Sequence, residues 1–317
     1  MILVCGEALI DLFVGPPEGA ELPARAVAGG SPFNVAIGLA RQGVEAAFLG
    51  GVSRDRFGQL LAETLRREGV DERFLVLTDR LSTLSAVATT PDGQPSYSFH
   101  GEGAADRSLL PSDLPSELPP EIAALTFGSY TMVVEPVGSS FAALAEREHG
   151  RRVISIDPNL RPTVVGDMAV WARAAERFYR TATIVKASDE DVHIAWGGHF
   201  SIGDAAAWWL GLGAKLVVVT TGVEGAVAYS VAGQIAVPGR AVSVCDTVGA
   251  GDTFHAALLA QLSRTGRLTP ESIGALDLAA IGDLVAYAGA AAAITVGRRG
   301  ADLPTEAEVA ASLQSCV

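Results

Sequence analysis

The sequence predicts an α/β fold in which helices cover a central, mostly parallel β-sheet, with a small second β-sheet attached as a lid. Three observations lead to this fold class. Short β-branched runs alternate with helical patterns along most of the chain, several helices carry end signals, and two separate stretches break the alternation with strand-like sequence. Hydrophobic residues make up 49% of the 317 residues and charged residues 19%, which is enough apolar surface for a packed core.

The strands of the central sheet are predicted from runs rich in β-branched residues. A segment with helical periodicity follows most of these runs, and this alternation is typical of βαβ units whose strands lie parallel. The predicted strands cover residues 2–5, 46–50, 124–127, 153–156, 183–185 and 216–220. We therefore expect one large sheet built mostly from parallel strands.

Three helices have clear sequence signals. Ser31 and Pro32 are expected at the N-cap and the first position of a helix that closes at Gly43. A second helix is predicted over residues 55–67. The uncharged stretch 284–297 is too short for a membrane span, so we expect a buried core helix there.

Two strand-like stretches interrupt the alternation, at residues 9–28 and 83–104. Turn signals at residues 15–17 and 91–93 divide them into strands. Because both stretches leave the α/β body and return to it, we predict a small β-sheet that acts as a lid within one domain spanning residues 1–317. Open edges of such a sheet favour pairing between two copies, so a homodimer is a further expectation.

The charge of the chain restricts its partners. A formal charge of -13 and an isoelectric point near 4.8 make nucleic acid and anionic membranes poor partners. Lys186 and Lys215 are the only lysines, and neither lies in a GxxxxGK[ST] phosphate-binding loop. The chain opens on a strand-like run without the features of a secretory signal, so we expect a cytoplasmic protein.

A glycine-rich turn leads into a predicted helix in the last third of the chain, with the sequence DTVGAGDTF at residues 246–254. The first N–H groups of a helix lack partners within it and the helix dipole is positive there. Gly249, Ala250 and Gly251 are therefore candidates for an anion hole that needs no lysine. Asp252 follows in the first turn, where a carboxylate can take the proton of an attacking hydroxyl. The alternative is that Asp252 only caps the helix.

This motif resembles the C-terminal signature of the ribokinase-like (PfkB) carbohydrate kinases, which reads much like DTxGAGDxF. Their N-terminal signature, a glycine pair that leads into an Asn-containing helix, is similar to GGSPFNVA at residues 29–36. The resemblance extends in order and spacing over essentially the whole chain. It implies a ribokinase-like three-layer sandwich with a β-sheet lid, and an ATP-dependent kinase in which Asp252 is the catalytic base.

The resemblance also implies which residues hold the sugar. The implied contacts are Asp11, Gly30, Asn34, Phe99, Arg161 and Asp252. Phe99 would cover the sugar ring from the lid, and Arg161, in the fructokinase-like segment DPNLRP, would neutralise phosphate charge or stack near the sugar. From the residues alone, Asp11 also fits a solvent-exposed charge, Phe99 a core residue of the lid, and Arg161 an anchor of its own loop.

For ATP, the family has a TxGxxG turn after a strand, which is similar to residues 220–225. The implied nucleotide contacts are Ser188, Thr220, Gly222, Gly225, Gly249, Gly251 and Gly289. Gly289 stands where many relatives carry Asn near the adenine, so the resemblance leaves one base contact open.

Two metal sites are implied. The family's NxxE motif, which organises Mg²⁺, stands here as SDED at residues 188–191. Asp191 keeps a carboxylate suited to Mg²⁺ directly or through water, and Glu190 is the alternative ligand. Asp246 would take part in a monovalent cation site of the kind that binds K⁺.

The combination of GEALID, GGSPFNVA, DPNLRP and KxSDE most resembles fructokinases, which implies conversion of fructose to fructose 6-phosphate. A 2-keto-3-deoxygluconate kinase, or another ribokinase-like sugar or nucleoside kinase, is the alternative. Against a 2-keto-3-deoxygluconate kinase, the lid carries Glu102 where such a kinase is expected to have an arginine that holds the substrate carboxylate. A dehydrogenase would need GxGxxG after the first strand, where Gly6 is followed by EALID. A non-catalytic sugar-binding module would not need Asp252.

Overall fold

The computed structural model describes residues 1–89 and 95–314, and a nine-stranded sheet forms the centre of this part of the chain. Its strands are β1 (Ile2–Cys5), β4 (Ala46–Ser53), β5 (Leu75–Thr78), β8 (Ala124–Gly128), β9 (Val153–Asp157), β10 (Ile184–Ser188), β11 (Leu216–Thr220), β12 (Gly225–Ser230) and β13 (Gly233–Pro238). They lie in the order β13-β12-β11-β10-β9-β8-β1-β4-β5, and all neighbours from β11 to β5 are parallel. The predicted α/β fold with a mostly parallel sheet is confirmed.

Each of the six predicted strands is present, and three further strands were missed. The prediction for β10 stopped at residue 185, whereas the strand runs on through Lys186 to Ser188, because polar residues end the apolar run before the strand itself ends. The missed strands β5, β12 and β13 lie at the two ends of the sheet. Their side chains are partly exposed, alternately along β12, so these strands do not form the continuous buried runs of the inner strands.

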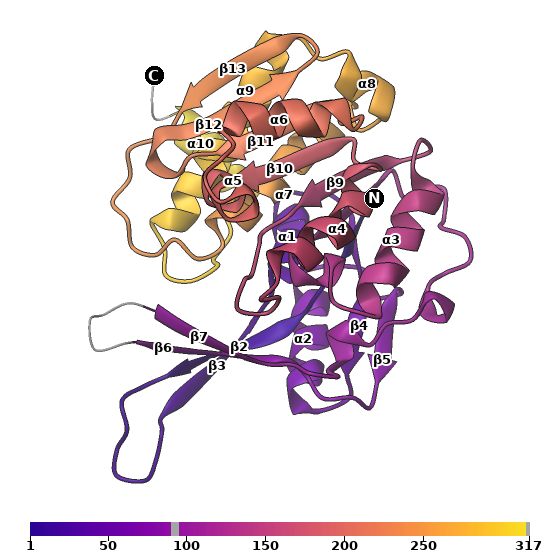
Figure 1. Cartoon of the computed structure of the whole chain (residues 1–317). Helices are drawn as coiled ribbons and strands as arrows, with labels where there is room; N and C mark the ends of the chain where they lie inside the picture. The colour runs from indigo at the N-terminus through magenta and orange to yellow at the C-terminus, as the bar shows by residue number, and fades with distance from the viewer. Residues whose placement is uncertain (90–94, 315–317) are drawn as a thin grey trace.

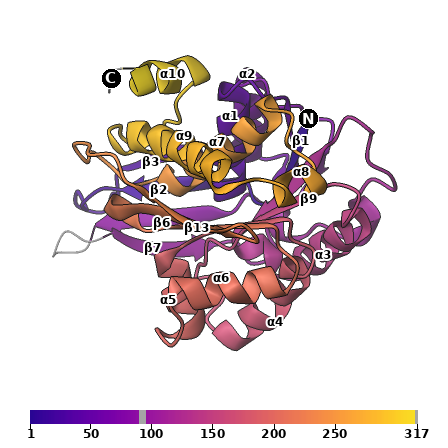
Figure 2. The ribbon, with the colours of Figure 1, turned by 90° about the horizontal axis from the view of Figure 1, so that it is seen from above.

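Helices cover both faces of the sheet, which gives the three layers seen in Figure 2. One face carries α1 (Ser31–Arg41), α2 (Arg56–Arg67), α7 (Ala250–Arg264), α8 (Pro270–Gly274), α9 (Leu278–Val296) and α10 (Glu306–Gln314). The other carries α3 (Val137–Glu148), α4 (Met168–Tyr179), α5 (Asp189–Trp196) and α6 (Ile202–Gly211). Short 3₁₀ turns lie at Ala105–Arg107, Pro111–Asp113, Ser129–Met132 and Gly222–Glu224.

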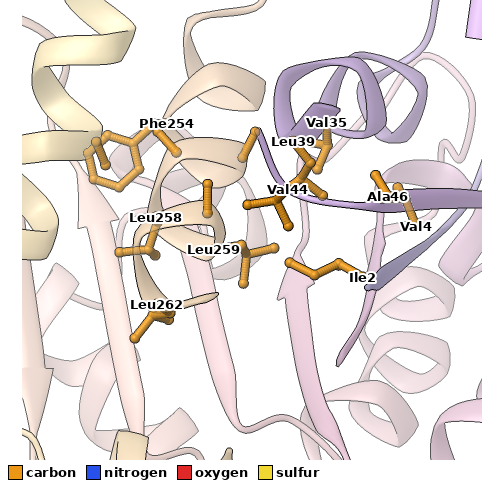
Figure 3. Close-up of a cluster of buried hydrophobic side chains, with 14 of the residues drawn as sticks. Ile2, Val4, Val35, Leu39, Val44, Ala46, Phe254, Leu258, Leu259 and Leu262 are labelled. Carbon is orange, nitrogen blue, oxygen red and sulfur yellow. The ribbon is translucent and has the colours of Figure 1, made fainter. Parts of the chain in front are cut away.

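The apolar core on the face of the sheet that carries α1 and α7 determines the position of α7. Leu258, Leu259 and Leu262 of α7 are fully buried and point into the same apolar layer as Ile2 of β1 and Leu39 of α1 (Figure 3). Burying side chains of this size contributes roughly 1.5–3 kcal/mol each. The amino end of α7 is therefore fixed against α1 by the packing below it.

Helix α9 is long and apolar enough to cross a membrane by length and composition alone. It packs against α7, α10 and the strands β12 and β13, and 44% of its most apolar stretch is buried. It extends the stretch predicted from residue 284 back to Leu278, past the charged Asp283. The core helix is confirmed, with one buried face.

A separate four-stranded sheet projects from the body (Figure 1). Its strands are β2 (Leu9–Val14), β3 (Ala24–Gly29), β6 (Leu84–Thr89) and β7 (Pro95–His100), in the order β3-β2-β6-β7. We call it the small sheet. The pairing Asp11↔Ser85↔Phe99 sets three side chains in one row, on one face of this sheet. The turn predicted at residues 91–93 lies outside the described residues.

The start of α1 differs from its prediction. Ser31 was expected at the N-cap, but Gly30 occupies that position with φ 113°, and Ser31 is the first helical residue. The buried carboxyl of Glu7 accepts the Ser31 N–H at 3.3 Å, so a remote side chain satisfies an N–H group that the glycine cap leaves open. The hydroxyl of Ser31 is thereby free for another contact. The helix predicted over 55–67 is confirmed as α2, with Asp55 as its N-cap.

Candidate active site

Loops gather at the carboxyl ends of the neighbouring strands β8, β9, β10 and β11. In parallel sheets this edge is the usual place for a ligand. The amino end of α7 reaches the same place, because Lys186 near the end of β10 lies beside Gly251. The structure therefore brings the glycine-rich turn of residues 246–254 to the edge where ligands are expected.

Gly249 begins α7 in a conformation that only glycine adopts easily. It is the N-cap, its φ is 79°, and a Cβ on it would lie 2.7 Å from Cβ of Ala301. Among the described residues, the N–H groups of Gly251 and Asp252 have no hydrogen-bond acceptor. The predicted anion hole included Ala250, but the Ala250 N–H donates to the carbonyl oxygen of Thr247 at 3.3 Å, so the open N–H groups at the positive end of the helix dipole are those of Gly251 and Asp252. Their use as an anion hole stays a prediction.

Asp252 is held by two residues of α1 that are more than 200 positions away in sequence. Ser31 Oγ donates to its Oδ1 at 2.6 Å, and Asn34 Nδ2 donates to its Oδ2 at 2.8 Å. Burial raises the pKa of Asp252 above its ordinary value, and these two hydrogen bonds oppose the rise. Since its oxygens bond to α1, and Gly249 is the N-cap, Asp252 does not cap α7.

The role of Ser31 gives a testable pH effect. A donor to a carboxylate favours the charged form, so Ser31→Ala should raise the pKa of Asp252 further. If Asp252 acts as a base, the acidic limb of the kcat–pH profile should then move to higher pH. Ser139→Ala is the matched control, because Ser139 also donates to a carboxylate, that of Glu135, but on the exposed start of α3. An unmoved limb in Ser31→Ala would contradict this role for Ser31.

The glycine pair at residues 29–30 makes room for two acids. A Cβ on Gly29 would lie 2.5 Å from Oδ2 of Asp11, and one on Gly30 would lie 2.8 Å from the carbonyl oxygen of Glu7. Burial raises the pKa of Asp11, and both Arg161 and Asp252 are close enough to influence it. The structure thus brings Asp11, Gly30, Asn34 and Asp252 together, as the sequence predicted.

Two further predicted sugar contacts lie around this group. Phe99 of the small sheet packs edge-on against Tyr130 of the body, with ring centroids 6.2 Å apart. Arg161 is exposed and donates to the carbonyl oxygen of Leu160 at 2.9 Å. Burial raises the pKa values of Glu7 and Asp11, that of Glu7 to about 8, and the charge of Arg161 opposes part of this rise. Arg161 therefore both anchors its own loop and faces the acids of the sugar side.

One argument from the sequence loses its force. The argument was that Glu102 stands where an arginine for a substrate carboxylate is expected, but the guanidinium of Arg107 lies against Gly101 just after β7, 4.9 Å above the ring of Tyr130. Its Nε and Nη2 are buried without a partner among the described residues. Glu102 alone therefore does not exclude a substrate with a carboxylate.

The sequence analysis did not predict that Lys186 belongs to the site. Its side chain is 5% exposed and forms an ion pair with Asp157, with Nζ 2.9 Å from Oδ2. Burial alone would lower the pKa of Lys186, but the charges of Asp157, Asp191 and Asp252 together with the Asp157 hydrogen bond raise it. Lys186 is the lysine of the KxSDE segment, which contributed to the resemblance but to which the sequence analysis gave no role in the site.

His255 lies beneath this pair and is neutral. Burial lowers its pKa to about 3, so the 3.7 Å approach of its Nδ1 to Asp157 is not an ion pair. Its Nε2 lies 2.7 Å from the hydroxyl of Ser155. Among the described residues, Lys186 is therefore the one charged partner of Asp157.

Asp191 and Ser188 have a structural role in α5. Ser188 is the N-cap, and Asp191 closes the capping box by accepting from the Ser188 N–H and hydroxyl, at 2.9 and 2.7 Å. The other oxygen of Asp191 accepts the Leu160 N–H at 2.8 Å and keeps one acceptor position. Among the described residues no group of three or more acids, histidines or cysteines is placed to hold a metal. This arrangement fits contact with a metal through water and does not fit a metal held mainly by the protein.

The predicted nucleotide residues lie in two places. Thr220 ends β11, and Gly222 and Gly225 flank the following turn with φ values of 57° and 113°. Gly289 lies within α9 with no atom within 4 Å of an added Cβ. Three solvent-exposed valines lie within this turn or beside the carboxyl end of α9: Val223 (87%), Val242 (41%) and Val244 (61%).

Asp246 ties two loops together. Its Oδ1 accepts the Val248 N–H at 3.1 Å, and its Oδ2 accepts the Gly300 N–H at 2.9 Å. These bonds hold the start of the glycine-rich turn against the segment after α9. The assignment of Asp246 to a monovalent cation stays a prediction.

Comparison with known proteins identifies a family and individual relatives. The model of the pfkB family carbohydrate kinases matches residues 1–308. A fructokinase of Rhizobium leguminosarum bv. trifolii is 42% identical over 278 residues, which are 87% of this chain and 84% of the relative.

Two solved fructokinases have the same fold. The Xylella fastidiosa fructokinase with bound ATP superposes with a TM-score of 0.89 at 26% identity, covering 99% of this chain and 98% of that one. The Vibrio cholerae O395 fructokinase, in a form that binds fructose, ADP and calcium ion, gives a TM-score of 0.80 at 32% identity and covers 98% of both chains. The predicted ribokinase-like fold is confirmed.

Proposed function

Since the chain belongs to the pfkB family of carbohydrate kinases, we propose that it transfers the γ-phosphoryl group of ATP to fructose and forms fructose 6-phosphate. The observation that carries this proposal is the carboxylate of Asp252, aligned by Ser31 and Asn34 beside the open N–H groups of α7. A base and an anion hole thus share one helical turn.

The reaction needs a proton acceptor and a place for the phosphoryl charge. Asp252 takes the proton of the primary hydroxyl as its oxygen attacks phosphorus. The raised pKa of this carboxylate suits a general base, because a base whose pKa lies closer to neutral pH accepts protons better. The open N–H groups of Gly251 and Asp252 would face the charge on the phosphoryl oxygens.

The sugar would bind between the body and the small sheet. Asp11 and Asn34 offer hydrogen bonds to its hydroxyls, and Gly30 lets the ring approach the backbone. Phe99 and Arg161 cover the same space from the small sheet and from the loop after β9. The small sheet would then act as a lid that excludes water during transfer.

ATP would lie along the ends of β10 and β11. We assign its phosphates to Gly249 and Gly251, with Ser188 nearby, and its base to the region of Thr220, Gly222, Gly225 and Gly289. Mg²⁺ supplies charge neutralisation on the phosphates when bound, and Asp191 would contact it through water. K⁺ near Asp246 is a further part of this proposal.

The remaining assignments concern the whole chain. We propose that residues 1–317 work as one kinase domain whose lid is formed by residues 9–28 and 83–104. The outer strands β3 and β7 of the small sheet are the edges through which a homodimer would form. The cytoplasm is the compartment that we propose.

Turnover on a panel of sugars tests the substrate. ADP formation should be fastest with fructose, compared with ribose, 2-keto-3-deoxygluconate and a nucleoside, because Asp11 and Asn34 offer hydrogen bonds to neutral hydroxyl groups. The panel includes a sugar acid because the unpartnered nitrogens of Arg107 could pair with a carboxylate. A clear preference for the sugar acid or the nucleoside would overturn the choice of fructose and leave the kinase assignment standing.

A further inference from the structure

Lys186 occupies the space directly beside the glycine-rich turn. A Cβ on Gly251 would lie 3.1 Å from Lys186 Nζ, which is closer than side-chain carbons normally approach a neighbour. The ammonium therefore sits next to the backbone whose N–H groups form the anion hole. Glycine at position 251 leaves room for both.

The ammonium of Lys186 is held in place by an ion pair with the buried Asp157. Asp157 ends β9 and is 3% exposed, and only its Oδ2 contacts Lys186. Its Oδ1 is buried without a partner among the described residues. Since His255 is neutral, the ion pair with Asp157 is what holds the Lys186 ammonium beside Gly251 of α7.

The acids around Lys186 indicate why a positive charge is needed at this place. Three carboxylates influence this one ammonium: Asp157, Asp191 and Asp252. Without the lysine, an incoming phosphoryl group would meet net negative charge in a buried setting, where repulsion is weakly screened. The helix dipole supplies only about half a positive charge.

Resting on the proposed kinase function, we propose that Lys186 is a catalytic residue whose ammonium contacts the γ-phosphoryl group at the turn of residues 249–251. Asp157 is its positioning residue. In the transfer, the bond from the sugar oxygen to phosphorus forms and the bond from phosphorus to the bridging oxygen of ADP breaks. The bridging oxygen keeps the electron pair. The hydroxyl proton goes to Asp252, and Lys186 keeps its own protons throughout.

A paired substitution tests this role. Lys186→Met alone leaves the charge of Asp157 buried and unpaired, so this variant is expected to lose folding stability for reasons unrelated to catalysis. Lys186→Met combined with Asp157→Asn removes both charges and should restore the melting temperature. Lys215→Met is the matched control, because Lys215 is the other lysine of the chain and is exposed at the start of β11.

We expect the double variant to keep its fold and to lose kcat by at least about a hundredfold, as for the loss of one preorganised donor to a reacting oxygen. Its affinity for ATP should fall by roughly tenfold, because a charge-assisted contact is lost, while its affinity for AMP stays unchanged. Lys215→Met should match the wild type in all three measurements.

Three results would overturn the role of Lys186. One is a double variant with kcat within about tenfold of the wild type, since the donor loss should cost more. Another is an unchanged ATP affinity. The third is an equal loss of AMP affinity, which would mark a general disturbance of the nucleotide site. A wild-type protein that phosphorylates no sugar would instead remove the proposed function itself, and this failure is visible without any variant.

Discussion

Replacing Asp252 by Asn is expected to lower kcat by about a thousandfold, within the range found when a general base is removed. Fructose affinity should change little, because Asn has the same shape and Asn34 can turn its amide to bond with it. The rate is measured as ADP formation, and sugar affinity by calorimetry.

This substitution also tests independently that Asp252 does not act as a helix cap. Asp and Asn are equally good helix caps, so a residue that only capped α7 would tolerate the change. Asp277→Asn provides the control, because Asp277 is the N-cap of α9 and its carboxylate accepts the Ala280 N–H. If Asp252→Asn kept a kcat near that of Asp277→Asn, Asp252 would not be the base.

The second large effect is expected at Gly249. In Gly249→Ala the added Cβ would strain a residue with φ 79° and would press on Ala301 at 2.7 Å. Relief of this contact must move the amino end of α7, and a misplacement of about 1 Å can cost roughly a hundredfold in rate. We therefore expect kcat/KM for ATP to fall by about that factor.

Gly266→Ala is a control on the same helix. Gly266 follows the carboxyl end of α7 with φ 66°, so alanine meets a similar backbone strain there. Nothing lies within 4 Å of its added Cβ. Both variants should lose about 1 kcal/mol of folding stability from the positive φ, but only Gly249→Ala should lose activity. Equal activity in the two would show that the position of the turn does not matter.

The sequence predicted the centre of the site because its residues lie in two compact motifs. Asn34 and Asp252 are 218 positions apart, yet each lies in a glycine-containing signature that is recognisable by itself. The central sheet was predictable for a similar reason, since buried parallel strands such as β1 and β11 are continuous apolar runs.

Other parts of the site depend on contacts that local sequence does not encode. Lys186 is one polar residue within a strand, and only the neighbouring strand β9 and helix α7 give it an ion-pair partner and a place beside the turn. Ser31 carries a true helix-start signal, but the buried Glu7 takes the Ser31 N–H and leaves its hydroxyl for Asp252. In both cases tertiary contacts decide what the side chain does.

For the residues predicted to contact a metal, the sequence pattern was clear but has a second, structural use. The acidic segment at residues 188–191 predicted a magnesium contact, and the structure places Asp191 in a capping box with its oxygens largely occupied. An acid in the first turn of a helix can close a capping box or contact a metal, and the sequence pattern is the same for both. The contact with Mg²⁺ through water therefore stays a prediction.

Identification of the product tests the central claim most directly. The protein is incubated with ATP, Mg²⁺ and fructose, and the phosphorylated carbon is located by phosphorus–proton correlation NMR. The account predicts one phosphate on the primary hydroxyl at carbon 6, formed in equal amount to ADP and absent when fructose is omitted. Release of inorganic phosphate without a sugar phosphate, or transfer to a secondary hydroxyl, would contradict it.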